Sequence, residues 1–146
     1  MADIRSIGPG DREQWEALFL AYGVFYKTDF SREVLDGVWG WLMDDAAPVT
    51  AIVSASGDTV LGFAMYRSLP DTFTAKPAWF LDDLYVAPEY RGSGAASALI
   101  LEVSKRARAQ GGGALRWITA DDNLTAQKVY NKLAKKTNYV TYELET

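Results

Sequence analysis

The sequence predicts an α/β protein with a mixed, mostly antiparallel twisted sheet of about six strands, flanked by about four helices. The apolar patterns follow the order β-α-α-β-β-β-α-β-α-β, which places a hairpin before a β-α-β-α-β half. The length of 146 residues suits one domain, predicted to span 1–146. A content of 49% hydrophobic and 23% charged residues is typical of a globular chain with a buried core.

The first third of the chain predicts a short strand followed by two helices. Residues 2–7 read as the strand, and Gly8-Pro9-Gly10 interrupts it. Asp11 is expected to cap a helix whose aromatic and aliphatic residues recur every three or four positions. Ser31 is expected to be the N-cap of a second amphipathic helix that ends near Asp44.

The middle of the chain predicts an antiparallel hairpin and a long strand. The β-branched and aromatic runs 49–55 and 59–66 are separated by the turn sequence Ser56-Gly57-Asp58. After a loop with two prolines, residues 78–87 form an apolar strand that contains two adjacent acids. Pro88 ends this strand.

The last third predicts two further helices and two short strands. Residues 89–94 open a helix that the glycines of 111–113 terminate. Residues 115–119 read as a strand, 123–133 as a helix and 139–144 as a final strand.

The composition excludes several kinds of chemistry. The chain has no His and no Cys, which excludes a Cys nucleophile, a Ser-His-Asp triad and a Cys/His zinc site. Any acid or base must therefore be a carboxylate, Lys, Tyr or bound water. Fifteen basic residues against nineteen acidic ones give a net charge of −4, which argues against nucleic acid as a partner. Neither a leader sequence nor a run of 18 apolar residues is evident, so we expect a cytoplasmic protein without membrane contact.

The turn at Arg91, Gly92 and Gly94 is suited to binding a phosphate group. Free N–H groups at a helix start carry partial positive charge, glycines let an anion approach them, and Arg91 adds a full charge. An ordinary strand-to-helix turn would also use glycine for its geometry. A Rossmann turn does not fit, because Ser97 follows where a third glycine is needed, and a Walker A loop does not fit, because the loop has no Lys.

Two motifs together resemble the GNAT superfamily of acyl-CoA-dependent N-acetyltransferases. The first is Arg91-Gly92-Ser93-Gly94-Ala95-Ala96, preceded by the strand residues 81–86. The second is the segment 117–123, followed by Ala126 and Tyr130. Within the superfamily the chain looks most like the diamine acetyltransferase-like members. The resemblance implies the GNAT fold for the whole chain, acetyl-CoA as co-substrate and no metal.

The resemblance also implies which residues bind acetyl-CoA. The main chain of one strand would pair with the pantetheine arm: Leu84, Tyr85 and Val86. The pyrophosphate would be bound by Arg91 and the amides of Gly92, Ser93, Gly94, Ala95 and Ala96. Asn123 would contact the cofactor arm.

Catalytic roles follow from the same resemblance. Tyr130 would protonate the departing thiolate, and Asp82 would take the proton of the amine, often through water. An alkyl amine with a pKa near 10.4 is neutral in only about one molecule in 2,500 at pH 7, so a nearby carboxylate is needed. Neighbouring acids on a strand point to opposite faces unless a bulge intervenes, so the base is Asp82, Asp83 or a water.

The acceptor is expected to be a small cationic amine. Asp82 and Asp83 would attract it by charge, and Tyr22 and Tyr26 by cation–π contact. The predicted activity is transfer of acetyl from acetyl-CoA to a polyamine-like, amino-acid-like or other small primary amine in a ternary complex. The alternatives are a non-catalytic acyl-CoA-binding or regulatory module, and a protein-lysine acetyltransferase. The resemblance suggests a homodimer.

Overall fold

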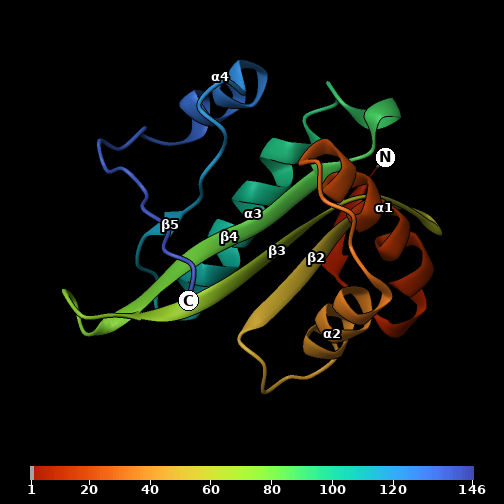
Figure 1. The fold of residues 1–146 in the computed structure, drawn as a ribbon, viewed down its shortest axis with the longest axis horizontal. Helices are drawn as coiled ribbons and strands as arrows, with labels where there is room; N and C mark the ends of the chain where they lie inside the picture. The colour runs from red at the N-terminus through yellow and green to blue at the C-terminus, as the bar shows by residue number, and fades with distance from the viewer. Residues whose placement is uncertain (1) are drawn as a thin grey trace.

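The computed structural model describes residues 2–146 and contains a five-stranded sheet with the order β1-β2-β3-β4-β5 (Figure 1). The first four strands pair antiparallel, and β5 runs parallel to β4. The α/β mixed sheet predicted from the sequence is thereby confirmed. The strands are β1 (Asp3–Ser6), β2 (Val49–Ser56), β3 (Thr59–Asp71), β4 (Lys76–Val86) and β5 (Leu115–Arg116).

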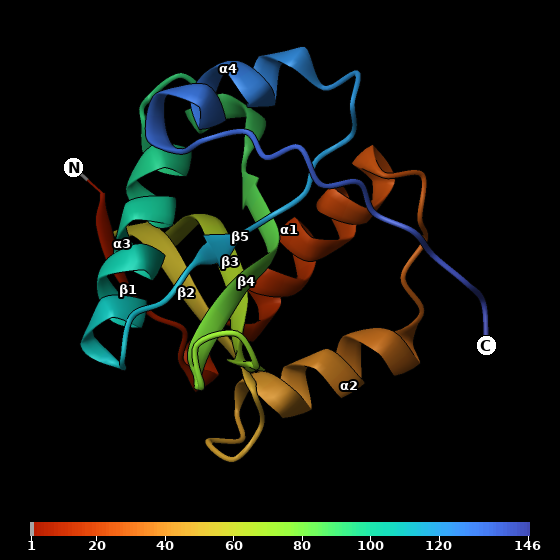
Figure 2. The same ribbon diagram turned by 90° about the vertical axis from the view of Figure 1, so that its left-hand side faces the viewer.

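Helices cover both faces of the sheet, which makes three layers (Figure 2). α1 and α2 pack on one face, and α3 packs on the other. α4 contacts α3 and follows β5 in the chain. The helices are α1 (Arg12–Phe25), α2 (Arg32–Leu42), α3 (Ala95–Ala109) and α4 (Leu124–Leu133).

The alternation of side chains along β3 divides the core in two. Phe63 and Met65 face α1 and α2, whereas Ala64 and Tyr66 face α3. Because both faces of the strand are covered, its sequence reads as a continuous apolar run. The aromatic side chains Trp15, Phe19 and Trp39 fill the first half of the core, and the aliphatic side chains Leu99, Ile100 and Val103 fill the second.

The two predicted helix caps have different outcomes. The Ser31 hydroxyl accepts a hydrogen bond of 3.2 Å from the amide of Val34, which confirms the N-cap of α2. The side chain of Asp11 does not cap α1. It is buried instead, where it accepts bonds from Arg5 and from the amide of Gly8.

Three predicted elements are shorter than expected or absent. Residues 139–144 form no strand, β5 has two residues rather than five, and 89–94 contains only a short 3-10 helix (Pro88–Tyr90) before α3 begins. The alternation in the tail is typical of a strand, but none of the strands found in residues 2–146 pairs with it. Its large side chains are therefore 73% to 91% exposed: Tyr139, Val140, Tyr142 and Leu144.

Candidate active site

β4 and β5 separate after only two residue pairs. Trp79 pairs with Leu115 and Phe80 with Arg116, and β5 ends there. The second half of β4, residues 81–86, therefore has β3 on one side and an open edge on the other. An open edge of this kind can accept another extended chain through main-chain hydrogen bonds.

The alternation of peptide groups decides which residues of β4 serve the open edge. The amide of Ala87 donates to Leu61 of β3, so by alternation the peptide groups of Tyr85 also face β3. Those of Leu84 and Val86 face the open edge. Of the three residues predicted to pair with the pantetheine arm, Leu84 thus presents its amide and carbonyl to the edge, and Val86 presents a free amide, because its carbonyl accepts a bond from Arg91. Tyr85 presents no main-chain group there, and its ring packs on the face of the sheet near Phe63.

The glycine turn before α3 has the geometry of an anion site. Gly92 and Gly94 have φ angles of 80° and 85°, which glycine adopts at little cost and which aim successive amides to one side. No described residue accepts a hydrogen bond from the amides of Gly92, Ser93, Gly94, Ala95 or Ala96. A Cβ built at either glycine meets no atom within 4 Å, so the turn is open to a ligand. These residues fit the diphosphate of an acyl-CoA.

Arg91 and Asn123 both have partners within the protein. The Nε of Arg91 donates to the carbonyl of Val86 at 3.0 Å, and its guanidinium lies 5.2 Å from the centroid of the Tyr85 ring. The Asn123 side chain caps α4 by accepting a 3.3 Å bond from the amide of Ala126. The terminal nitrogens of Arg91 remain available to a phosphate, whereas Asn123 has a structural role that the sequence prediction did not include.

A β-bulge brings both acids of β4 to one face of the sheet. Asp83 pairs with Met65, and Leu81 pairs with Tyr66, so Asp82 is the extra residue. Its carboxylate lies 3.0 Å from the Nε of Arg67, which shares a face of β3 with Met65. The two acids therefore do not point to opposite faces, as an unbulged strand would require.

Asp83 is the acid with the unusual environment. Its half-buried carboxyl interacts with the Tyr22 hydroxyl of α1, and burial raises its pKa from 3.8 to about 6. The bond from Tyr22 opposes this rise, and the charge of Asp82 adds to it. Burial also raises the pKa of Asp82, but its ion pair with Arg67 counteracts the effect.

Two further tyrosines lie near Tyr22. Tyr26 follows α1, with its ring centroid 4.9 Å from that of Tyr22, and burial raises its pKa, with a smaller contribution from the charge of Asp83. Tyr130 of α4 packs edge-on against Trp117 at 5.4 Å. Burial raises the pKa of Tyr130, with a smaller contribution from Tyr26. Segments from α1, β4 and α4 thus bring one carboxyl and three phenols into one neighbourhood.

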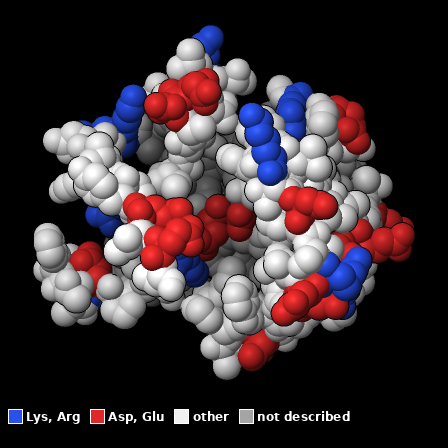
Figure 3. All heavy atoms as spheres, in the orientation of Figure 1, with Lys and Arg blue, Asp and Glu red and all other residues white. Residues whose placement is uncertain are grey.

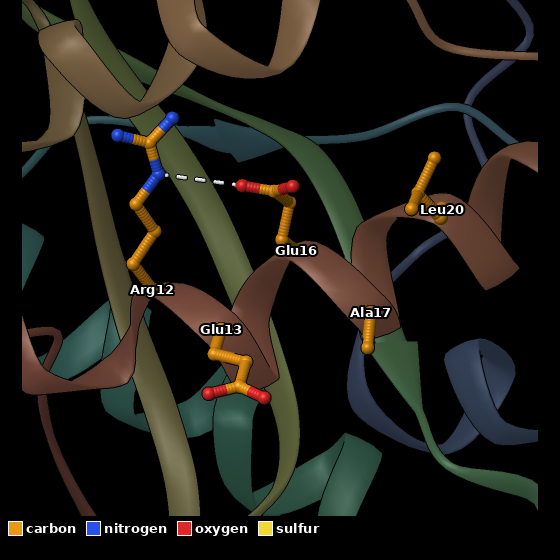
Figure 4. A pocket seen from close by; sticks show the side chains of 5 residues that line it. All are labelled: Arg12, Glu13, Glu16, Ala17 and Leu20. Carbon is orange, nitrogen blue, oxygen red and sulfur yellow. Dashed lines mark hydrogen bonds and ion pairs between the residues drawn. The ribbon is translucent and has the colours of Figure 1, made fainter. Parts of the chain in front are cut away.

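The surface is hollowed between the part formed by β5 and α4 and the part formed by α1, and acidic atoms lie in this hollow (Figure 3). Two other surface depressions lie elsewhere. One is on the outer side of α1, where Arg12 bonds to Glu16 beside Glu13, Ala17 and Leu20 (Figure 4). The other is on α2 and includes Trp41. Neither contains a residue of the predicted site.

Two absences hold for residues 2–146. The described residues include no cluster of three or more metal-ligating acids. None of the helices that the structure describes has the length and apolar character needed to span a bilayer.

Arg67 and Phe80 were not singled out from the sequence. Arg67 lies fifteen residues before Asp82, and only the pairing of β3 with β4 brings them together. The guanidinium of Arg67 also lies 5.3 Å from the centroid of the Phe80 ring. A hairpin prediction with the correct register and the bulge would have been needed to find this group.

The curated relatives include enzymes that acetylate amines. The chain is 30% identical over 142 residues to the D-amino-acid N-acetyltransferase HPA3 of Saccharomyces cerevisiae. This match covers 96% of the chain and 88% of the yeast protein. The chain is 35% identical over 89 residues to the thialysine N-epsilon-acetyltransferase of Bos taurus. That match covers 58% of this chain and 52% of the relative, so it spans about half of the relative's length.

Solved structures share the fold. The ribosomal-protein-alanine N-acetyltransferase from Brucella melitensis biovar Abortus 2308 has a TM-score of 0.83 at 23% identity and covers 100% of this chain and 99% of its own. An aminoglycoside N-acetyltransferase in complex with CoA has a TM-score of 0.85 at 21% identity, with 99% and 95% covered. The model of the acetyltransferase (GNAT) family matches residues 12–134. The resemblance inferred from the two motifs is therefore confirmed, and the chain belongs to the GNAT family of acetyltransferases.

Proposed function

We propose that this protein transfers an acetyl group from acetyl-CoA to a small primary amine. The observation that carries the proposal is the position of Asp83. A half-buried carboxyl with a pKa of about 6 lies beside Tyr22, which Tyr26 and Tyr130 adjoin, and on the strand whose open edge leads to the glycine turn. A general base works best when its pKa lies near the operating pH.

The first step is deprotonation of the amine. A protonated amine is attracted to the charged Asp83, and the Tyr22 hydroxyl stabilises this charge, because it lowers the pKa of the carboxyl. Asp82, to which the sequence prediction gave the base role, is bonded to Arg67. We therefore assign the proton transfer to Asp83, directly or through one water, and a supporting position to Asp82.

The second step is attack of the neutral amine on the thioester carbonyl. A C–N bond forms, the C–S bond breaks, and negative charge develops first on the carbonyl oxygen and then on the sulfur. The amide of Leu84 faces the open edge and can donate to the oxygen. Tyr130, whose pKa burial raises above its ordinary value, is protonated at neutral pH and can donate its proton to the thiolate. The second proton of the attacking nitrogen is lost as the C–S bond breaks and restores the Tyr130 hydroxyl, so the products are the N-acetylated amine and the CoA thiol. The chain has no Cys to carry the acetyl group, which supports direct transfer in a ternary complex.

The glycine turn supports acetyl-CoA as the donor. Free amides from Gly92 to Ala96 and the terminal nitrogens of Arg91 match a diphosphate in charge and hydrogen bonding. A structural neighbour with the same fold is a complex with CoA. The named relatives act on amino-acid and thialysine amines, which favours a small acceptor. A single domain over 1–146, a homodimer and a cytoplasmic location remain predictions from the sequence.

The test is release of CoA thiol from acetyl-CoA in the presence of a panel of amines. We expect turnover with small primary amines, loss of turnover in Asp83→Asn, and unchanged binding of acetyl-CoA by this variant in calorimetry. Asp58→Asn, an exposed acid in the turn between β2 and β3, is the matched control. Binding of acetyl-CoA without turnover of any amine would instead support the non-catalytic module. Turnover restricted to lysines in proteins would support a protein-lysine acetyltransferase.

A further inference from the structure

Arg67 is held on the same face of the sheet as Asp83. Its Nε lies 3.1 Å and 3.0 Å from the two carboxylate oxygens of Asp82. The guanidinium carbon lies 5.3 Å from the centroid of the Phe80 ring. One edge of the guanidinium plane is thus fixed by a carboxylate, and one of its faces lies against an aromatic ring.

The other edge of the guanidinium is unoccupied by the protein. The terminal nitrogens of Arg67 have no acceptor among residues 2–146, and 46% of the side chain is exposed. Arginine presents its donors in a planar fork that matches a carboxylate with two parallel hydrogen bonds. Because Asp82 uses only the Nε, the terminal pair remains oriented and able to bind a second carboxylate.

Arg67 and Asp83 are close neighbours across the bulge. Met65, two residues before Arg67 on the same face of β3, pairs with Asp83. Asp82, which is bonded to Arg67, is adjacent to Asp83 in the chain. An acceptor whose amine reaches Asp83 therefore has a guanidinium within reach of its other end.

The charges also limit the kind of acceptor. Arg67 neutralises Asp82, so the face between β3 and β4 has one unpaired negative charge, on Asp83, instead of two. A polyamine with several positive charges would meet the free edge of a guanidinium. A molecule with one amine near Asp83 and a carboxylate near Arg67 would find an opposite charge at both ends.

We propose that Arg67 binds the carboxylate of the acceptor, so that the protein prefers free amino acids to amines that lack a carboxylate. Asp82 and Phe80 are the positioning residues that hold the fork in place. The inference rests on the proposed function, because it names the acceptor class of the same site. The proposed site would also favour free amino acids over lysines within proteins, because the carboxyl groups of those lysines are in peptide bonds.

The experiment compares acceptors that differ only in the carboxylate. Both enantiomers of each amino acid are compared with the decarboxylated amine: lysine with pentane-1,5-diamine, and leucine with 3-methylbutylamine. Lysinamide, in which an uncharged amide replaces the carboxylate, is assayed as well. We expect the wild-type kcat/KM to favour the amino acids. Arg67→Gln should lower kcat/KM for the amino acids by about 10- to 100-fold, chiefly through KM. It should not lower kcat/KM for the decarboxylated amines, and it should raise the value for the diamine, because Asp82 loses the charge that neutralises it.

Two further variants separate binding from folding. Arg67→Lys keeps the charge but loses the fork, and should retain part of the preference. Arg12→Gln is the matched control, because Arg12 is also a partly exposed arginine that pairs with acids and lies 5.8 Å from an aromatic centroid, that of Trp39. It should leave the acceptor preference unchanged. Thermal unfolding of each variant shows whether the protein remains folded.

The outcomes distinguish the two proposals. Equal losses with both acceptor classes, no loss with either, or a wild-type preference for the decarboxylated amines would overturn the carboxylate site and leave the proposed function intact. Absence of turnover with every amine would contradict the proposed function. Calorimetry of lysine and of pentane-1,5-diamine with the CoA-loaded protein then still decides the point, because only the carboxylate site predicts a preference that Arg67→Gln removes.

Discussion

Replacing Asp83 with Asn should make the protein more stable at neutral pH while removing its activity. Burial raises the pKa of Asp83 from 3.8 to about 6, so the folded protein holds this proton more tightly than the unfolded chain does. Asn is uncharged and nearly the same size, and its carbonyl oxygen can face the Tyr22 hydroxyl as the carboxyl oxygen does.

The pH range of the effect follows from the two pKa values. Below pH 3.8 the carboxyl is protonated in both states, and the wild type loses nothing. Between pH 3.8 and about 6 only the unfolded chain deprotonates, so the free energy of unfolding falls as the pH rises. Above pH 6 the full loss is present. The rise of about two pH units, at 1.36 kcal/mol each, gives an upper bound of about 3 kcal/mol.

The assay is urea unfolding of wild type and Asp83→Asn between pH 4 and pH 8. We expect the variant to be more stable by up to about 3 kcal/mol at pH 8, with a gain that disappears near pH 4. The exposed Asp58→Asn should differ from wild type by less than about 0.5 kcal/mol throughout. A variant that is less stable at pH 8, or a difference independent of pH, would refute the reasoning.

Three further predictions concern activity and cofactor binding. The wild-type kcat/KM should rise about tenfold per pH unit up to about pH 6, where Asp83 ionises, and should be constant above that pH. A pH–rate profile without a bend in this region would exclude Asp83 as the base. Tyr130→Phe should lower kcat by about 100-fold with little change in acetyl-CoA affinity, and a variant with full kcat would remove this phenol from the acid role. Gly94→Ala places a side chain at a φ of 85°, which should lower stability by about 1 kcal/mol and weaken acetyl-CoA binding in calorimetry. Gly57→Ala places a side chain at a φ of 58° in the turn between β2 and β3. It should lower stability by a similar amount and leave the affinity for acetyl-CoA unchanged. Equal affinity losses in both glycine variants would show that strain, and not the turn itself, is being measured.

Local sequence signals predicted the parts of the fold that are local in origin. The cap at Ser31, the hairpin around Gly57 and the glycine turn at Gly92 and Gly94 each depend on a few neighbouring residues, and the structure contains all three. The prediction of a final strand was wrong, because a strand does not depend on local sequence alone. Residues 139–144 have the composition of a strand, but a strand also needs a partner, which no pattern within the segment can supply.

The motifs predicted which residues form the candidate site, but they did not predict the charge environment of its two acids. The sequence pointed to Asp82 and Asp83 together and could not rank them, because their environments are set by distant elements. α1 brings Tyr22 to one acid, and β3 brings Arg67 to the other. The bulge that turns both acids to one face is a property of the pairing between two strands, and neither strand alone contains a signal for it.

The extra residue at Asp82 also makes the β3–β4 hairpin modular. On one side of it lie the residues that we propose hold the donor and carry out the chemistry, and on the other side lie Arg67 and Phe80, nearer the tip of the ribbon. Substitutions toward the tip can therefore change which molecules are accepted without moving the register of the reacting half. Deleting Asp82 itself would only remove the bulge, because Leu81 would stay opposite Tyr66 and Asp83 opposite Met65. Deleting a residue elsewhere in the paired part of β4 would instead turn every side chain beyond the deletion to the wrong layer. We expect the protein to tolerate exchange of the tip far better than such a deletion.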